Sequence, residues 1–245
     1  MALCNLNFEN TAYEISYELT NLKAQKSLLI LHGWGANKEL MKQAFNPVLS
    51  EYKCLYLDLA GFGKSNSPIS LDTKGYARLI EAFLKHLHFT PNALMGHSFG
   101  GKICALLSLS QNAELLILLS SAGIIWQKSL KTKFKIKLFK ALKALGLGKF
   151  YTLFASKDAQ NLSPLMYETF KKVVDEDFSE IFAGIPCKTL IFWGQDDKAT
   201  PLKSGEKIAS LIKENEFYPL KGDHFFFLKH AEFIAKIIHK NLEQS

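Results

Sequence analysis

The sequence is organised as short runs of consecutive apolar residues separated by longer stretches with helical periodicity. The runs show no polar alternation, which is typical of strands that are buried on both faces of a parallel sheet. Strands that alternate with helices predict a mostly parallel sheet covered by helices on both faces. The runs are SLLILHG (27–33), KCLYLDL (53–59), NALMG (92–96), LLILLSSAG (115–123) and KTLIFWG (188–194), and a further short strand is expected at EFYPL (216–220).

Two other patterns complete this fold class. Residues 3–8 and 12–19 alternate apolar and polar side chains around ENT, which predicts an antiparallel hairpin before the first buried strand. Helices are expected near 38–49, at 73–87, after the glycines that follow Phe99, at 203–213 and at 231–242. We therefore expect an α/β protein with a sheet of about eight strands.

Residues 125–186 interrupt the alternation of strands and helices. This block is helix-like throughout and has no strand pattern, and from Lys128 to Lys149 it carries eight lysines and no acidic residue. A helical block between two sheet strands predicts a lid over the carboxyl ends of the strands, where open α/β sheets bind ligands. We expect a core of residues 1–124 and 187–245 and a lid of residues 125–186.

Composition narrows the class of protein. With 245 residues, 48% of them hydrophobic, the chain can bury one sizeable core. The first residues lack a signal-peptide pattern, and the longest nearly apolar run (115–126) is shorter than the roughly 20 residues of a membrane helix. Four scattered cysteines suggest neither a disulfide framework nor a zinc site. We expect a cytoplasmic monomer or dimer without metal or organic cofactor. The net charge of +7 favours anionic partners without indicating nucleic acid.

The most specific motif lies at the end of NALMG. Gly96-His97-Ser98-Phe99-Gly100 fits G-x-S-x-G between a predicted strand and a predicted helix, which is the context of a nucleophile elbow. Glycines on either side of the serine let strand and helix approach so closely that side chains there would clash. The start of the helix presents unpaired N–H groups that favour a developing oxyanion. The pattern predicts Ser98 as a nucleophile; the alternative is a loop serine in a glycine-rich turn.

Together with two further motifs, this elbow resembles the α/β-hydrolase superfamily. His32-Gly33-Trp34-Gly35 matches the HG-x-G turn that the family places after an early strand. The stretch DLAGFGKS (58–65) is similar to the family's D-x-x-G-x-G-x-S loop. The resemblance covers nearly the whole chain and implies the α/β-hydrolase fold with an inserted helical lid. It also implies an oxyanion hole made by the backbone N–H groups of Trp34 and Phe99.

The family's order along the chain is serine, acid, histidine. Among seven histidines, His224 follows the last predicted strand and precedes the last helix, where the family places its base. Imidazole can accept and return a proton near neutral pH. The stretch GQDDKATP (194–201) resembles the family's G-x-x-D-x-x-x-P pattern and indicates Asp197 as the acid. Asp196 and Asp223 remain alternatives for this role.

The other candidate residues are less specific. We expect His97 to direct its ring away from the serine oxygen and His32 to make a structural hydrogen bond, although His32 also stands beside the predicted pocket. Aromatic lid residues could line an acyl pocket or pack the lid onto the body. The residues proposed to line the substrate pocket are His32, Trp126, Phe134, Phe154, Tyr167 and Phe225.

These motifs predict a serine hydrolase that performs two-step acyl transfer, and we expect a carboxylesterase for small to medium acyl esters. A serine in the elbow argues against the dehalogenases and epoxide hydrolases of the family, which use aspartate there. Carbon–carbon hydrolases of ring-fission products are an alternative. They often have asparagine before the nucleophile and a longer Gly/Pro-rich oxyanion loop, whereas this chain has His97 and HGWGANKEL.

Two further interpretations remain open. HGWG-x-N also resembles the oxyanion loop of pimeloyl-carrier methyl ester esterases, and with the lysine-rich lid it suggests an acyl group carried on an acidic protein. The alternating basic and apolar residues of KFKIKLFKALKAL favour a simpler explanation of the lysines, a solvated helix face. From another class, an inert ligand-binding protein with this fold is the non-enzymatic alternative.

Overall fold

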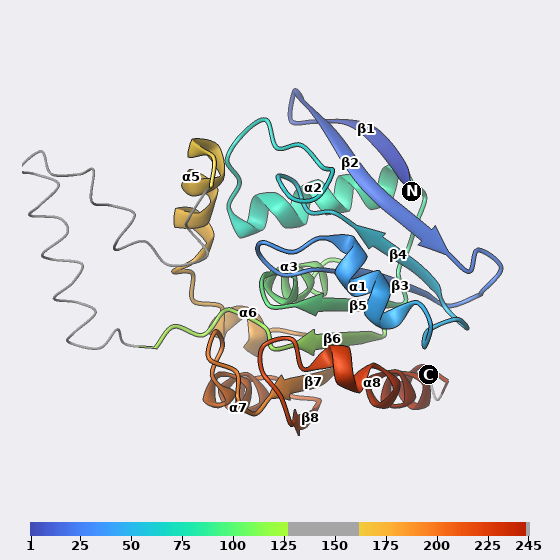
Figure 1. The fold of residues 1–245 in the computed structure, drawn as a ribbon, viewed down its shortest axis with the longest axis vertical. Helices are drawn as coiled ribbons and strands as arrows, with labels where there is room; N and C mark the ends of the chain where they lie inside the picture. The colour runs from blue at the N-terminus through green and yellow to red at the C-terminus, as the bar shows by residue number, and fades with distance from the viewer. Residues whose placement is uncertain (127–161, 244–245) are drawn as a thin grey trace, which may run out of the picture.

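A computed structural model describes residues 1–126 and 162–243. Its centre is an eight-stranded sheet with the order β1-β2-β4-β3-β5-β6-β7-β8 (Figure 1). Neighbouring strands are parallel from β4 to β8 across the sheet, whereas β1 is antiparallel to β2 and β2 is antiparallel to β4. The predicted sheet with an initial hairpin is confirmed. The strands are β1 (Ala2–Phe8), β2 (Thr11–Thr20), β3 (Ser27–Leu31), β4 (Lys53–Leu57), β5 (Ala93–His97), β6 (Leu115–Leu119), β7 (Lys188–Gly194) and β8 (Asn215–Leu220).

The described helices lie close to the predicted ones. They are α1 (Lys38–Phe45), α2 (Thr73–His86), α3 (Phe99–Leu107), α5 (Pro164–Val173), α6 (Ser179–Ala183), α7 (Leu202–Leu211) and α8 (Phe227–Leu242). Helix α1 ends before the predicted residue 49 because Pro47 has no backbone N–H with which to continue the helical hydrogen bonds. Helix α8 begins before the predicted residue 231, and its first residue, Phe227, is fully buried in the core.

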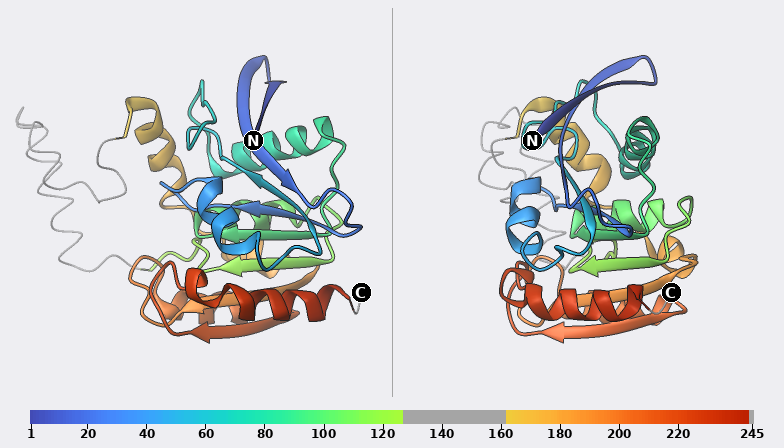
Figure 2. Two further views of the ribbon diagram at one scale, coloured as in Figure 1. Left: turned by 45° about the vertical axis from the view of Figure 1, so that its right-hand side comes forward. Right: turned by 90° about the vertical axis from the view of Figure 1, so that its right-hand side faces the viewer.

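The two faces of the sheet bury two separate apolar clusters, although nearly every position of the central strands is apolar. Successive side chains of a strand point to opposite faces. In β3, Leu29 and Leu31 face the cluster with α2, α3, α6 and α7, and Leu28 and Ile30 face the cluster with α1 and α8. Both faces are thus covered by helices (Figures 1 and 2). No helix within the described residues combines the length and apolarity needed to cross a membrane.

The described part of the predicted lid consists of α5 and α6. Helix α5 lies beyond the carboxyl ends of the strands (Figure 1), and its Phe170 ring meets the Trp34 ring at 5.3 Å. Helix α6 packs instead against α3 and α7, with Phe182 fully buried in the core. The pocket candidates Phe134 and Phe154 lie outside the described residues, as do the lysines from Lys128 to Lys149.

The turn between β5 and α3 has no room for side chains at Gly96 and Gly100. A Cβ atom on Gly96 would lie 2.3 Å from the carbonyl oxygen of Gly100. A Cβ atom on Gly100 would lie 2.6 Å from the carbonyl oxygen of His32. The close approach predicted from the motif is therefore present, and it joins the elbow to the end of β3.

Replacing Gly96 with alanine is expected to destabilise the protein, because the backbone contact leaves no direction in which the new methyl group can relax. We expect Gly96→Ala to lower the free energy of unfolding by about 1–3 kcal/mol. Gly184→Ala is the matched control, since a Cβ atom there would lie 3.5 Å from its nearest neighbour and the backbone φ is −91°. Urea unfolding followed by circular dichroism measures both; equal stability of the two variants would contradict this account.

Candidate active site

Ser98 occupies the turn between β5 and α3 with a strained backbone, φ 50° and ψ −112°. Three backbone hydrogen bonds hold it there. Its N–H donates to the carbonyl of Leu119 at the end of β6 (3.0 Å), and its carbonyl accepts from the N–H groups of Gly101 (3.0 Å) and Ala122 (3.1 Å). The serine is half-buried at the carboxyl edge of the sheet, as the motif predicts.

The structure brings Asp197 and His224 together, although 27 positions separate them in the sequence. Nδ1 of His224 lies 2.7 Å from Oδ2 of Asp197, so this nitrogen carries the proton and donates to the carboxylate. The Asp197 side chain is fully buried, and that of His224 is 17% exposed. The imidazole bonds Asp197 and not the alternative acids: Asp196 is exposed, and Asp223 accepts a hydrogen bond from the N–H of Phe225.

The loop after β7 holds the Asp197 carboxylate from several directions. Oδ1 accepts the backbone N–H groups of Ala199 (2.8 Å) and Thr200 (2.9 Å), and Oδ2 lies 2.9 Å from the Thr200 hydroxyl. Burial raises the pKa of Asp197, but the bonds from His224, Thr200 and Ser120 outweigh it, so the pKa lies below its usual value. Asp197 is therefore an ionised and oriented partner for the imidazole.

A cavity of about 430 Å³ contains Ser98 and His224 in its wall, together with Trp34 and Phe99. The Trp34 and Phe99 rings pack edge to face at 5.6 Å, so the two residues predicted to form the oxyanion hole are neighbours. Phe99 is the first residue of α3, where a helix supplies no acceptor for the backbone N–H. The remaining wall residues are Lys102, Ser121, Ala122, Gly123, Ile124, Trp126, Phe170, Val173, Val174, Ala199, Thr200, Pro201, Ser204 and Phe225.

The predicted pocket residues have different outcomes. Trp126 and Phe225 line the cavity, and Trp126 donates from its indole N–H to the Ser204 hydroxyl at 2.7 Å. Tyr167 lies on α5 but is not part of the wall.

His32 does not line the cavity either, because its ring is fully buried beneath the loop after β3. Nδ1 donates to the Gly33 carbonyl (2.7 Å), and Nε2 accepts the Leu59 N–H (3.0 Å). This is the structural hydrogen bonding expected for His32, and it leaves no ring nitrogen for a substrate.

A buried ion pair supports the loop that carries Trp34. Lys38, the first residue of α1, donates from its backbone N–H to Oδ1 of Asp58 and from Nζ to Oδ2, both at 2.8 Å. Nζ also contacts the Ser16 hydroxyl at 2.9 Å, and both charged side chains are 1% exposed. Separating the two side chains would leave a buried charge without a partner, which is costly. The pair therefore holds the start of α1 against the loop after β4.

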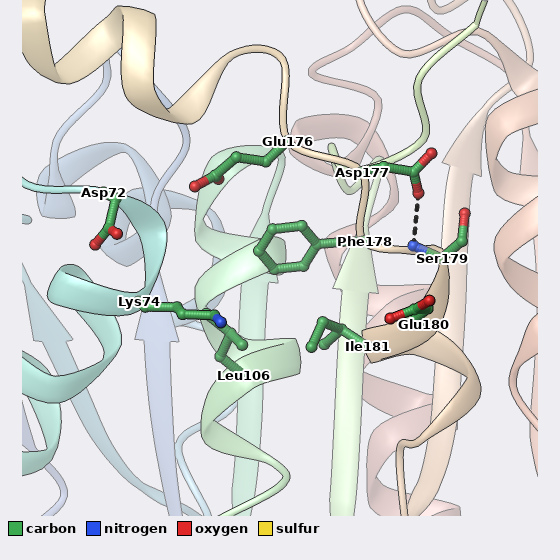
Figure 3. Close-up of a pocket in the computed structure, with 9 residues that line it drawn as sticks. All are labelled: Asp72, Lys74, Leu106, Glu176, Asp177, Phe178, Ser179, Glu180 and Ile181. Atoms are coloured by element: carbon green, nitrogen blue, oxygen red, sulfur yellow. Dashed lines mark hydrogen bonds between the residues drawn. The ribbon is translucent and has the colours of Figure 1, made fainter.

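Lys102 was not predicted as a site residue. It follows Ser98 by one helical turn, and its Nζ donates to the Val173 carbonyl (2.7 Å) and to Glu176 (2.6 Å). Glu176 lines a second cavity of about 730 Å³ with Asp72, Lys74 and Phe178 (Figure 3). The Lys102–Glu176 pair therefore lies between the two cavities and attaches the segment after α5 to α3.

The residues that the sequence analysis missed come from α5, α3 and the loop after β7. Phe170 and Val173 sit on an amphipathic helix whose sequence shows an apolar face but not what that face covers. Lys102 could have been noticed as the one charged residue in the apolar stretch that follows the elbow. Thr200 carries no sequence pattern that distinguishes it from an ordinary loop threonine.

Comparisons with known proteins agree with the fold. Residues 26–121 match the model of the α/β-hydrolase fold family. The chain is 25% identical to the AB hydrolase superfamily protein YisY of Bacillus subtilis, over 87% of this chain and 90% of that protein. It is also 25% identical to 2-hydroxy-6-oxo-6-(2'-aminophenyl)hexa-2,4-dienoic acid hydrolase of Metapseudomonas resinovorans, over 85% of this chain and 81% of that protein.

Among solved structures, a thermophilic esterase from Thermogutta terrifontis superposes with a TM-score of 0.74 at 18% identity, covering 100% of this chain and 99% of that chain. The sheet order, the elbow and the cavity at the carboxyl edge are those of the α/β-hydrolase fold. With the sequence relatives, they point to the α/β-hydrolase superfamily.

Two buried histidines beside the site predict how stability depends on pH. Burial lowers the pKa of His32 from 6.5 to about 4 and that of His97 from 6.5 to about 3, so both are neutral in the folded protein. The unfolded chain takes up these protons below pH 6.5 and the folded chain does not, so stability falls as the pH is lowered toward 4.

We expect the free energy of unfolding to fall by about 2 kcal/mol between pH 6 and pH 5, since each histidine contributes up to about 1.4 kcal/mol per pH unit. The measurement is urea unfolding at several pH values. His97→Gln removes one titrating ring and should reduce the slope by the contribution of one proton. An equal slope in this variant would show that His97 is not the source.

Proposed function

We propose that the protein is a serine hydrolase in which Ser98 is the nucleophile, His224 the base and Asp197 the acid that orients the base. The observation that carries the proposal is the 2.7 Å bond between His224 and the buried Asp197, beside a cavity that Ser98 also lines. The strained backbone of Ser98 supports it, since strain of this kind concentrates at functional positions.

The mechanism follows from the tautomer of His224. With the proton of Nδ1 donated to Asp197, Nε2 is the free base that removes the proton from Ser98 Oγ. Oγ attacks the substrate carbonyl carbon, and the backbone N–H groups of Trp34 and Phe99 stabilise the resulting oxyanion. His224 then protonates the leaving group, which departs from an acyl-enzyme. Water activated by His224 adds to the acyl-enzyme and releases the acid and Ser98.

We favour a carboxylesterase for small to medium acyl groups. The cavity of about 430 Å³ is lined mainly by apolar side chains, including Ile124, Phe170 and Val173, and its charged member Lys102 is already paired with Glu176. An uncharged acyl chain suits such a wall, because burying an unpaired polar group is costly. The structural likeness to an esterase is compatible with this choice.

Carbon–carbon bond hydrolysis is the second candidate. The relative from Metapseudomonas resinovorans carries the name of a dienoic acid hydrolase, and it matches this chain over most of its length. Its substrate bears a carboxylate, so this candidate requires that Lys102 exchange Glu176 for the substrate or that another cation reach the cavity.

We also propose that the acyl group of the substrate is carried on an acidic protein. It rests on Lys128 to Lys149, which lie outside the described residues. Replacing several of these lysines with glutamine should lower activity on anionic or carrier-bound substrates only, and equal losses on neutral esters would count against it.

A fluorophosphonate probe is expected to label the wild-type protein at Ser98, because the probe reacts with a serine that an adjacent base has activated. Ser98→Ala should abolish labelling, whereas Ser121→Ala, which removes another hydroxyl of the same wall, should not. Mass spectrometry of the labelled peptide identifies the serine. If the folded wild-type protein is not labelled, the result would favour the non-enzymatic alternative, an inert ligand-binding protein with this fold.

Substrate class is tested by a panel of p-nitrophenyl esters of increasing acyl length, assayed beside a ring-fission dienoate. We expect the highest kcat/KM for short to medium acyl chains and a sharp decline for chains longer than the cavity can hold. The matched control is Ser98→Ala on the preferred ester, where turnover should fall by at least about a thousandfold. Turnover of the dienoate without ester turnover would establish the second candidate instead.

A further inference from the structure

His97, the last residue of β5, joins three parts of the site although it does not line the cavity. It precedes Ser98 in the chain, and its ring lies against the ring of His224, with centroids 4.6 Å apart. The ring is 1% exposed. The inference below rests on the proposed function, since it concerns how the base is held near the nucleophile.

One ring nitrogen has a definite partner. Nε2 of His97 lies 3.0 Å from the backbone carbonyl oxygen of His224. A carbonyl can only accept, so Nε2 carries the proton and donates it. This bond reaches the backbone of the base residue, whereas Asp197 holds its side chain. Main chain and imidazole of His224 are thus held separately.

The other nitrogen, Nδ1, packs against the loop that carries Trp34. It lies 2.8 Å from the position that a Cβ atom would take on Gly33, and within the described part of the chain no hydrogen-bond partner reaches it. Since Nε2 holds the proton, Nδ1 is the bare nitrogen, and a glycine at position 33 gives it space.

Aromatic neighbours fix the plane of the ring. The ring centroids of Phe225 and Phe227 lie 5.4 Å and 4.9 Å from that of His97. Phe225 belongs to the loop before α8, and Phe227 is the first residue of α8. Burial keeps the pKa of His97 low, so the ring stays uncharged when His224 acquires a proton during catalysis. A positively charged His97, with its ring 4.6 Å from that of His224, would oppose the protonation of His224.

We propose that His97 is a positioning residue that sets the distance between the His224 imidazole and Ser98 by donating Nε2–H to the His224 carbonyl. The bond connects the last residue of β5 directly to the backbone of His224. Without it, the 221–226 segment keeps its link through Asp197, but the backbone of His224 loses its connection to β5.

The test compares His97→Gln with His97→Met. The two side chains are unbranched and similar in size, and only glutamine carries an amide N–H as many bonds from Cβ as Nε2 of histidine. Both variants lose the ring packing, so a general effect on stability is shared. The readouts are kcat and KM on the preferred p-nitrophenyl ester, with active sites counted by fluorophosphonate titration, and the melting temperature.

For His97→Met we expect kcat per titrated site to fall by about 10- to 100-fold, because displacements of about 1 Å in a catalytic group have effects of this size. KM should change by less than about twofold, since His97 lines no part of the cavity. His97→Gln should restore kcat to within about fivefold of wild type while melting at the same temperature as His97→Met.

Equal kcat per titrated site in the two variants would overturn the positioning role and leave His97 as core packing. If His97→Met does not fold, His97→Asn replaces it, because asparagine carries the same amide one carbon closer to the backbone and cannot reach the carbonyl. A wild-type protein that neither labels nor turns over any substrate would overturn the proposed function, and the role of His97 with it.

Discussion

The contact between strand β5 and the first turn of helix α3 is the interaction on which the rest of the structure depends. Gly96 and Gly100 allow the strand and the helix to meet at backbone distance, and Gly100 rests against the end of β3. This contact forces Ser98 into its strained conformation, and the end of β6 holds it there. The strain is tolerated because backbone hydrogen bonds with Leu119, Gly101 and Ala122 hold Ser98 in this conformation.

Around this turn, each buried charged side chain has a partner. The Lys38–Asp58 pair supports the loop of Trp34, Lys102 and Glu176 attach the segment after α5, and Asp197 holds His224. His32 and His97 are buried, and burial lowers the pKa of both imidazoles so that they are neutral. The result is a cavity whose wall combines oriented polar groups with apolar side chains, an arrangement compatible with the acyl transfer proposed for this site.

Much of this architecture could be read from the sequence because its signals are local. Continuous apolar runs identify strands buried on both faces, and the G-x-S-x-G spacing identifies a turn that only glycines permit. The α5 segment shows the limit of this reasoning. Its periodicity predicts a helix, but the choice of Phe170 as a neighbour of Trp34 depends on how the helix docks. His32 shows the same limit: its motif indicates a structural hydrogen bond or a place in the pocket, and the folded chain buries its ring outside the cavity wall.

The sequence by itself determined the order of strands and helices, the elbow at Ser98 and the short set of candidate acids and bases, because each of these follows from residue types at fixed spacing. Only the tertiary structure decided that Asp197 rather than Asp196 or Asp223 meets His224. It also decided that Lys102 and Glu176 pair and that His97 reaches the carbonyl of His224. The physical reason is that these contacts join segments brought together by the packing of parallel strands, and no local pattern encodes the distance between them.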